Sequence, residues 1–393
     1  MMFGKKSITF LVIFAIITFM VSYCAYATFG IDIFIDGKKV EVQDSPFIHN
    51  GRTLVPLRAV GDVLGAEILW DSEKSIAIAK NEETVVEFSH GKESIKVNGE
   101  EIKLDTSPFI VKDKMFVPLR AVAESFGKTV SFDGKRGIIN ISGKNPLKVH
   151  FLYAGQADSS FIELPDNKCM LIDAGTADFG KELVSFIKKL GYEKIDTVIA
   201  THPHADHIGG MSEILKSFEI GHFYMPKKTH TSQTFENMIS LLQEKKIKTN
   251  YAKSGDVLFD EDAKCTVLAP VRNDYERMNN HSLVLKLTYG ETEILFSADA
   301  EIDSELDMLE KNLDLDSDVL KAGHHGSDSS STDMYINEVS PESVVISVGK
   351  DNPYDFPSPS VLELFDKKNI NVYRTDILGT VVLETDGFVY TIN

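Results

Sequence analysis

The sequence holds little cysteine and no excess of positive charge. Three cysteines in 393 residues are too few for a disulfide framework, so burial of apolar side chains must hold the fold together. Cys169 and Cys265 lie in apolar stretches and are expected to be buried thiols, with a single bridge between them as the alternative. The net charge of -18 argues against a broad basic surface for duplex nucleic acid. An anionic ligand would therefore have to be attracted locally, for example by metal ions.

Long apolar runs are also scarce, and the only one lies at the N-terminus. Two lysines precede an apolar run over residues 8–21 and a small-residue site at residues 25–27. This order is typical of a secretory signal peptide over residues 1–27. An uncleaved membrane anchor and a lipoprotein through Cys24 are the alternatives, and both also leave the rest of the chain outside the cytoplasm. We therefore expect a secreted or cell-surface protein that contacts a membrane only through this segment, if it stays uncleaved.

One segment of the sequence occurs twice. Residues 45–71 (SPFIHNGRTLVPLRAVGDVLGAEILWD) return as residues 107–133 with a constant offset of 62 and no gap. Each copy predicts a turn, a short strand, a helix that VPLRAV begins and that ends at Gly65 or Gly127, and a further strand. The pattern indicates a small α+β module used twice over residues 31–142.

The VPLRAV strings and the LG or FG that follows them resemble the copper amine oxidase N-terminal "stalk" domain. Residues 31–142 contain no histidine cluster, cysteine pair or set of catalytic carboxylates, so the sequence gives no support to copper or oxidase chemistry. We expect Arg58 and Arg120 to pair with nearby acidic residues, the alternative being that they grip an anionic polymer. The resemblance implies a spacer or a surface-binding role, with the cell wall as the candidate contact.

The pattern changes after a linker at residues 143–148. Residues 147–393 alternate short apolar strands with helical stretches, which predicts an α/β class and a four-layer αββα sandwich of two sheets covered by helices. The predicted helices are residues 181–191, 209–218, 234–246 and 359–368.

A dense histidine cluster, THPHADHIGG, follows the apolar run TVIA in this second part. Imidazole and carboxylate are the ligands that zinc and its neighbours prefer, with manganese or iron as competitors. His202 and His204 stand on alternate residues of an extended segment, so they can bind one ion together. After the chain turns, Asp206 and His207 can reach a second ion. The string predicts a site for two divalent metal ions.

Further ligands are expected at the ends of other predicted strands. ILFSADAE supplies Asp299, an anion that could bridge the two ions, and LKAGHHGS supplies the pair His324 and His325. Asp173 in LIDAG follows another strand, where a carboxylate can hold a ligand histidine through its second ring nitrogen. The four strand ends together favour one metal centre.

These motifs, together with HFLYAGQADSSFI and YRTDILGTVVLETDG, resemble the metallo-β-lactamase fold over residues 147–393, and within it the hydrolase domain of the ComEC/Rec2 competence-protein type. The resemblance implies that one histidine of the 324–325 pair completes the second metal site, and we favour His325. His324 would then be an outer or substrate-facing residue. The implied metal ligands are His202, His204, Asp206, His207, Asp299 and His325.

The sequence departs from these relatives at a few positions. Asp355 and Phe356 stand where relatives often carry glycine and then histidine, and Ala157 and Ala298 replace glycines of the usual GQGD and GDA strings. His281 lies where many relatives have no histidine. It is either a ligand of the first metal or a polar loop residue, and the sequence leaves both open.

The expected function is a secreted or surface-associated binuclear hydrolase, most simply a phosphodiesterase or nuclease-like enzyme that uses metal-bound hydroxide. Asp206 would hold the hydroxide, with His324, Ser327 and Asn280 as donors to the developing charge, although Asn280 can equally stabilise a turn. The substrate would be an anionic ester or phosphodiester. The alternatives are an enzyme for another envelope ester, such as a phosphocholine ester, lactone or lactam, and a catalytically weakened surface-binding protein, which Phe356 favours.

Overall fold

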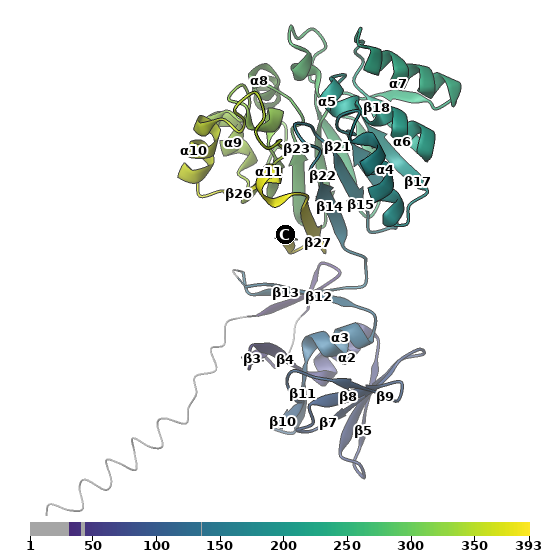
Figure 1. Cartoon of the computed structure of the whole chain (residues 1–393). Coiled ribbons are helices and arrows are strands. Elements are labelled where there is room, and N and C mark those ends of the chain that lie inside the picture. The colour runs from purple at the N-terminus through teal and green to yellow at the C-terminus, as the bar shows by residue number, and fades with distance from the viewer. Residues whose placement is uncertain (1–30, 41–43, 135) are drawn as a thin grey trace, which may run out of the picture. The chain divides into compact units, whose positions relative to one another are not determined.

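The computed structural model describes residues 31–40, 44–134 and 136–393, and the chain divides into two compact units at Gly143 and Lys144 (Figure 1). The predicted signal peptide lies outside the described residues. Within the described ranges, no helix is long and apolar enough to cross a membrane.

Among its described residues, the N-terminal unit contains three small sheets and two short helices. The first sheet has the order β12 (Thr129–Asp133), β13 (Ile138–Ser142), β1 (Asp32–Ile35) and β2 (Lys38–Val40). The second has the order β10 (Phe109–Val111), β11 (Lys114–Pro118), β4 (Arg52–Pro56) and β3 (Phe47–His49). The third has the order β5 (Glu67–Asp71), β6 (Ile76–Lys80), β7 (Val85–Ser89), β8 (Ser94–Val97) and β9 (Glu100–Lys103).

The two helices of this unit begin where the repeat predicts. Helix α2 (Leu57–Leu64) and helix α3 (Leu119–Ser125) each follow a proline, which cannot donate a ladder hydrogen bond and so ends the preceding strand. Helix α2 ends at Gly65, whose φ of 66° is in the left-handed region that glycine adopts without a Cβ clash. Helix α3 ends at Ser125, two residues before Gly127, where the sequence predicted its end.

The two copies of the repeat meet around a local two-fold axis. Strand β4 pairs with β11 in antiparallel register, and Val55 lies opposite Val117, its own counterpart at the offset of 62. The rings of Phe47 and Phe109, another matched pair, lie 5.5 Å apart. The duplicated sequence therefore folds as two halves of one module, with a shared apolar core.

The C-terminal unit contains two large mixed sheets. The first has the order β19 (Thr249–Tyr251), β18 (Glu219–Met225), β17 (Lys194–Ile199), β16 (Cys169–Ile172), β15 (Ser160–Glu163), β14 (Leu147–Phe151), β27 (Val381–Thr385) and β28 (Tyr390–Ile392). The second has the order β20 (Val257–Asp260), β21 (Lys264–Ala269), β22 (Val284–Tyr289), β23 (Thr292–Phe296), β24 (Val319–Lys321), β25 (Ser343–Ile346) and β26 (Asn371–Arg374). One apolar cluster, which includes Phe151 and Phe296, fills the space between the sheets.

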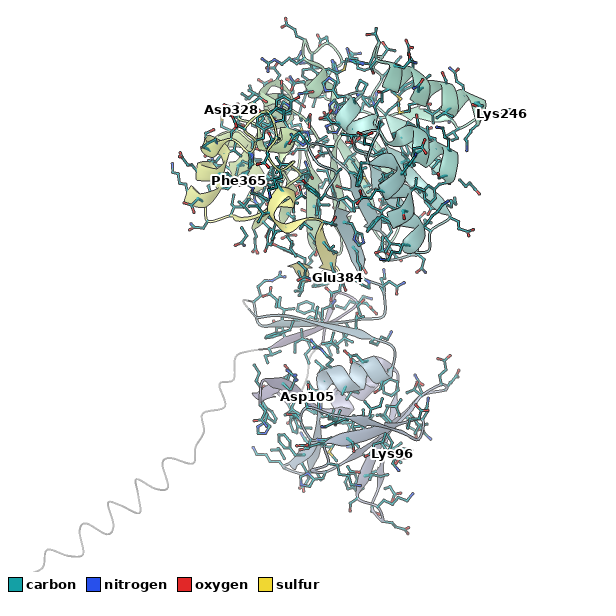
Figure 2. All side chains as sticks on the ribbon, in the orientation of Figure 1. Lys96, Asp105, Lys246, Asp328, Phe365 and Glu384 are labelled. Atoms are coloured by element: carbon teal, nitrogen blue, oxygen red, sulfur yellow. The ribbon has the colours of Figure 1, made fainter. Side chains whose placement is uncertain are left out.

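Helices cover the outer face of each sheet (Figure 1). Helices α4 (Gly180–Lys189), α5 (Ala205–Ile208), α6 (Met211–Ser217) and α7 (Gln233–Glu244) cover the first sheet. Helices α8 (Ile302–Glu310), α9 (Asp333–Val339), α10 (Pro359–Lys367) and α11 (Thr375–Leu378) belong with the second, and Phe365 of α10 is buried there. Figure 2 shows the charged side chains of Lys246 and Asp328 at the surface of the same unit. The predicted four-layer αββα sandwich is confirmed, and Cys169 and Cys265 are buried free thiols as expected.

Helices α8 and α9 are absent from the sequence prediction. The buried face of α8 carries Ser304 and Glu305, so it lacks the apolar periodicity of a core-facing helix. The carboxylate of Glu305 accepts hydrogen bonds from the backbone nitrogens of Ser331 and Thr332, at 2.5 and 3.0 Å, just before α9. Burial of a polar group is tolerated here because its hydrogen bonds are made.

Candidate metal centre

The predicted ligands follow four strands whose carboxyl ends meet at one edge of the sandwich. Strand β16 is parallel to β17, and β23 is parallel to β24. Asp173 follows β16, the histidine cluster follows β17, Asp299 follows β23, and the 324–325 pair follows β24. Parallel pairing brings these strand ends together, as in other α/β sites.

The side chains form two groups that share one carboxylate. His202, His204 and Asp299 each place a ligand atom within 4.8 Å of the others. Asp206, His207, Asp299 and His325 form the second group by the same measure. Asp299 is thus placed between the two groups, as the predicted bridging anion would be.

Buried polar atoms at the second group lack hydrogen-bond partners among the residues that the structure describes. These atoms are His207 Nε2, Asp299 Oδ1 and His325 Nε2. His207 Nε2 and Asp299 Oδ1 lie 3.2 Å apart without the alignment of a hydrogen bond. Leaving such atoms unsatisfied costs about 1–3 kcal/mol each, whereas a divalent cation would satisfy all of them. The donor set of nitrogen and carboxylate oxygen fits zinc, manganese or iron.

Asp173 holds the ring of His207. His207 Nδ1 donates to Asp173 Oδ2 at 2.7 Å, and Thr201 donates to the same carboxylate from its backbone nitrogen and its hydroxyl, at 2.8 and 2.6 Å. A proton fixed on Nδ1 leaves the Nε2 lone pair for a metal ion. The structure therefore places Asp173 behind His207, a predicted metal ligand, where the sequence expected such a carboxylate.

Replacement of Asp173 by asparagine should weaken metal binding at the second group. The amide keeps the volume but loses the charge that orients His207, and such outer partners typically contribute 10–100-fold in metal affinity. The measurement is a zinc titration of the purified protein by calorimetry. Asp196→Asn is the control, because Asp196 is partly buried and accepts a hydrogen bond from Cys169 N of strand β16, away from the cluster. Equal zinc affinities for the two variants would contradict this role.

His325 is oriented in the same way by a backbone carbonyl. Its Nδ1 donates to Ser347 O at 2.9 Å, and its Nε2 lies 3.3 Å from Asp206 Oδ2. Burial lowers the pKa of His325, but the charges of Asp158 and Asp299 outweigh burial and raise it to about 10. The geometry brings His325, the residue favoured as the ligand, into the second group.

The two groups differ in their electrostatics. Burial holds the pKa of His202 well below its usual value, so this ring is neutral and able to accept a metal. Burial opposes the charged form of Asp206, but the attraction of His207 outweighs burial and lowers the pKa of Asp206 to about 2. Burial also opposes the charged form of His207, but the carboxylates of Asp299 and Asp173 help to raise the pKa of His207 well above its usual range. The carboxylates thus concentrate positive charge at the second group, which a divalent cation can supply in place of protons.

His324 lies outside both groups but beside them. Its Nδ1 is hydrogen-bonded to Ser329 Oγ at 2.9 Å, and its Nε2 lies 3.9 Å from Asp299 Oδ2. The side chain of His324 is 23% exposed, whereas the side chains of His207 and His325 in the second group are almost fully buried. The ring can therefore face a substrate, as predicted for the non-ligand member of the pair.

Asn280 does not face the metal centre. Its side chain is buried, and its Oδ1 accepts hydrogen bonds from the backbone nitrogens of Glu301 and Ser304, at 3.0 and 3.2 Å. These nitrogens lie at the beginning of helix α8, so Asn280 satisfies backbone donors that the helix itself cannot. These contacts favour the alternative left open by the sequence, a turn-stabilising residue, over a donor to substrate.

Ser327 and His281 also take structural positions. Ser327 is buried, and its hydroxyl lies 3.0 Å from that of Ser329, which in turn holds His324. Ser327 thus supports the 324–329 loop where we predicted a contact with substrate. His281 is hydrogen-bonded through Nε2 to Tyr275 O at 3.1 Å and belongs to neither group. The structure therefore favours the polar loop residue over the metal ligand at position 281.

Sequence reasoning missed a buried ion pair behind His325. Lys321 Nζ donates to Asp158 Oδ2 at 2.9 Å, and Asp158 Oδ1 lies 3.4 Å from His325 Nδ1. Lys321 is 2% exposed and Asp158 5%. A lysine inside the apolar run VLKAG was the available signal, because a buried lysine needs a carboxylate partner.

The two alanines that replace glycines have different consequences. Ala157 has an ordinary backbone conformation, and its methyl group is fully buried in the core beneath the first sheet. Ala298 has φ of 46°, in the left-handed region that disfavours residues with a Cβ. Of the two alanines, Ala298 is the one with backbone strain, and it lies directly before Asp299 in the chain.

Ala298→Gly should destabilise the C-terminal unit much less than Ala157→Gly. Both changes remove a buried methyl group and add freedom to the unfolded chain, but only Ala298→Gly relieves left-handed strain, which gives back about 1–2 kcal/mol. The measurement is the midpoint of urea unfolding followed by circular dichroism, with Ala157→Gly as the control. Equal losses for the two variants would refute the assignment of strain.

Comparison with known proteins agrees with both parts of this description. The chain belongs to the metallo-beta-lactamase superfamily, whose model matches residues 152–350. Residues 34–141 match the copper amine oxidase N-terminal domain, so both predicted resemblances are confirmed.

Among individual relatives, the chain is 32% identical over 251 residues to ComE operon protein 3 of Bacillus subtilis (strain 168), covering 60% of this chain and 32% of that protein. It is 26% identical over 243 residues to Recombination protein 2 of Haemophilus influenzae, covering 61% of this chain and 29% of that protein. It is 30% identical over 93 residues to Exodeoxyribonuclease WalJ of Streptococcus pneumoniae, covering 23% of this chain and 33% of that protein. The chain thus spans about a third of the length of these relatives.

Proposed function

We propose that the C-terminal unit is a binuclear metal-dependent phosphodiesterase of nuclease-like type that acts outside the cytoplasm. The observation that carries the proposal is the carboxylate of Asp299, shared by two groups of buried ligand atoms. Two cations bound in this way would supply a hydroxide nucleophile near neutral pH and polarise the bond to be cleaved. Zinc is the first candidate, with manganese and iron as alternatives.

The residues of the chain then have separate tasks. Asp206 is ionised and 36% exposed, so one oxygen can bind a cation while the other accepts a proton from the nucleophile. His324 Nε2 lies 3.9 Å from Asp299 Oδ2 and 3.4 Å from Asn279 Nδ2. With the proton on Nε2, the ring can donate a hydrogen bond to charge that develops on the substrate. Ser329 holds the other ring nitrogen of His324 and so fixes the direction of that donor.

The surface beside His324 suits a substrate with a flat aromatic group. Phe356 packs against His324 with ring centroids 5.6 Å apart, and Tyr354 stacks on Phe356 at the same centroid distance. Tyr354 is 63% exposed, so one face of its ring is open to a ligand. Bases of single-stranded nucleic acids stack on such rings without sequence preference. Phe356, at the position where relatives often have histidine, thus gives the site a stacking surface.

The relatives support a nucleic-acid substrate. One is named an exodeoxyribonuclease and another a recombination protein. The low content of basic residues is consistent with a short single strand held by cations and stacking, in place of a duplex held by a basic surface. The proposed extracellular location rests on the order of residues 1–27.

The proposal is tested by hydrolysis of an activated phosphodiester by residues 28–393 with zinc or manganese, beside Asp206→Asn. We expect metal-dependent turnover that the variant lacks. A panel of single-stranded DNA, RNA, a phosphocholine ester, a lactone and a lactam then identifies the substrate class. Turnover of only the lactone, lactam or phosphocholine ester would replace the proposed substrate. Two bound metals without turnover of any substrate would indicate the catalytically weakened binding protein.

Tyr354→Ala should separate small substrates from nucleic acids. Loss of one stacking platform costs about 1–3 kcal/mol, which is a rise in KM of about 5- to 150-fold for a single-stranded oligonucleotide. The activated phosphodiester, which has no base, should show little change. Tyr251→Ala is the matched control, because Tyr251 is 57% exposed on β19 at the edge of the first sheet. An equal loss on both substrates would contradict a stacking role for Tyr354.

A further inference from the structure

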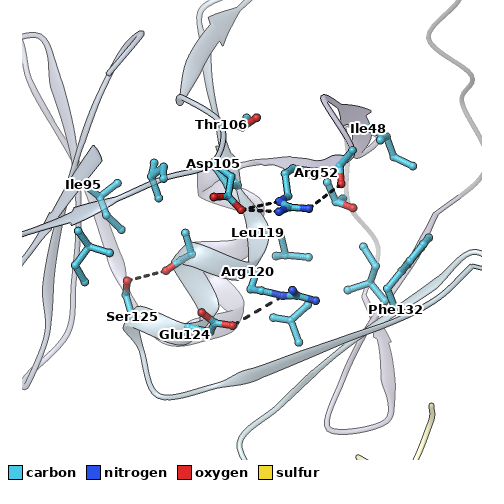
Figure 3. Close-up of a pocket in the computed structure, with 18 of the residues that line it drawn as sticks. Ile48, Arg52, Ile95, Asp105, Thr106, Leu119, Arg120, Glu124, Ser125 and Phe132 are labelled. Atoms are coloured by element: carbon cyan, nitrogen blue, oxygen red, sulfur yellow. Dashed lines mark hydrogen bonds and ion pairs between the residues drawn. The ribbon is translucent and has the colours of Figure 1, made fainter. Parts of the chain in front are cut away.

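The N-terminal unit has two pockets in equivalent positions of its repeats. The first, of about 420 Å³, lies between Arg52 in one copy of the repeat and Arg120 in the other (Figure 3). The second, of about 870 Å³, lies between Lys114 and Arg58, which are the same two positions with the copies exchanged. Both volumes fall within the range of about 300–1,000 Å³ that is usual for small-ligand sites.

The equivalence follows from the local two-fold axis between β4 and β11. Each pocket takes a hairpin from one copy and a helix start from the other, so neither copy forms a pocket alone. Ile48 of the first pocket corresponds to Ile110 of the second at the offset of 62, and Leu119 of the first corresponds to Leu57 of the second. The duplication has therefore produced two composite sites of related chemistry.

Each pocket exposes an aromatic ring at the same repeat position. Trp70 lines the second pocket and is 49% exposed, and Phe132 lines the first and is 44% exposed. Ile48 and Ile110, again a matched pair, are 45% and 41% exposed in the same pockets. Both pockets thus expose apolar side chains at equivalent positions of the repeat. Exposed apolar surface inside a concave site indicates a contact with a ligand.

The polar groups of the pockets are both donors and acceptors. In the first pocket Arg52 donates to Asp105 at 2.6 Å, and Arg120 lies 3.9 Å from Glu124 (Figure 3). The looser pair leaves most donors of the Arg120 guanidinium to solvent, and its side chain is 64% exposed. The predicted pairing of this arginine is therefore weak.

The second pocket repeats this polar arrangement. Lys114, the counterpart of Arg52, pairs with Asp44. Arg58, the counterpart of Arg120, is exposed in the wall of the same pocket. Each pocket thus combines one aromatic face, one ion pair and one exposed arginine.

We propose that the two pockets bind saccharide units of one polysaccharide chain. A sugar ring has an apolar face that can lie on Trp70 or Phe132, and its hydroxyl groups both donate and accept hydrogen bonds. The carboxylates of Asp44 and Asp105 are acceptors for such hydroxyls, and the arginines are donors. A repeating polymer that engages both sites at the same time would bind about 10²–10⁴-fold more tightly than at one site.

A polyphosphate chain fits this surface less well. Phosphate oxygens only accept hydrogen bonds, so the carboxylates of Asp44, Asp105 and Glu124 would repel them. Acidic and basic residues are nearly equal in number over residues 31–143, so this unit lacks the strong positive field of a single-strand binder. Single-stranded DNA is therefore the contrasting ligand for the test.

The first experiment measures sedimentation of residues 28–393 with insoluble chitin, cellulose or peptidoglycan sacculi, in the presence of EDTA so that the metal centre does not contribute. We expect binding to at least one of these polymers. Trp70→Ala and Phe132→Ala should each raise its Kd by about 10²-fold, because each leaves a single site. Val85→Ala is the matched control, since Val85 is 38% exposed in the same unit but lines neither pocket.

The second experiment uses a soluble oligosaccharide cut from the polymer that binds. Trp70 is the only tryptophan of the chain, so its fluorescence reports the second pocket alone. Phe132→Ala should leave that fluorescence titration unchanged while polymer binding falls. Binding to none of the polymers, binding that both aromatic variants retain, or binding of a single-stranded DNA oligomer in their place would overturn the proposal.

Discussion

Asp299→Asn is expected to remove nearly all turnover and to empty at least one of the two ligand groups of metal. Asp299 is 2% exposed and is the one side chain present in both groups. The amide keeps the shape but loses the anionic charge that two neighbouring cations need between them. We expect metal content to fall from two ions to one or none, and kcat/KM to fall by at least about 10³-fold, since loss of a single donor to the transition state already costs about 10²–10³-fold.

The measurements for this variant are metal analysis after dialysis and phosphodiester turnover. Asp328→Asn is the matched control, because Asp328 is an exposed aspartate close in sequence to the 324–325 pair and belongs to neither group. This control should keep two ions and full activity. Retention of two ions by Asp299→Asn would show that the two groups do not depend on a shared carboxylate.

Lys321→Met is expected to give the largest loss of stability in the C-terminal unit. Lys321 and Asp158 are both almost fully buried, and removal of the lysine leaves the carboxylate without its closest counter-charge. Breaking a buried pair from one side typically costs about 3–5 kcal/mol. Addition of Asp158→Asn should recover part of that loss, because no unpaired buried charge then remains.

The loss is measured by urea unfolding with two signals in the same chain. Circular dichroism follows both units, whereas fluorescence of Trp70 follows only the N-terminal unit and should not change in the variant. Lys286→Met is the matched control: Lys286 is 5% exposed, but its partners Glu293 and Asp314 have side chains that are 28% and 78% exposed. Water can solvate both partners, so we expect a smaller loss. Equal losses for the two lysines would mean that the Asp158 pair has no special role.

The metal ligands could be predicted because most of them are local in the sequence. The spacing of His202, His204, Asp206 and His207 reflects one strand end and one turn, and local geometry follows from spacing. The prediction that Asp299 bridges the two ions relied on the resemblance as well as on its place after a strand. The roles themselves stay predictions until metal is bound and measured.

Residues that act across the fold were harder to predict. Asn280 looked like a donor to substrate, but its amide oxygen serves the beginning of α8, more than twenty residues later in the chain. Lys321 and Asp158 are separated by 163 positions, so no local pattern connects them. Polar side chains in loops have several satisfactory partners, and only the packed structure decides which partner is in reach.

The sequence by itself determined the duplicated module, the αββα class and the local set of candidate metal ligands, because periodicity and short spacings act within single strands and helices. Tertiary structure decided which histidine of the 324–325 pair joins the ligand group, that His281 is hydrogen-bonded to a backbone carbonyl, and that the repeats exchange parts to form two pockets. These outcomes depend on pairing between strands distant in the sequence. Such pairing is set by the packing of the whole core, which no single segment encodes.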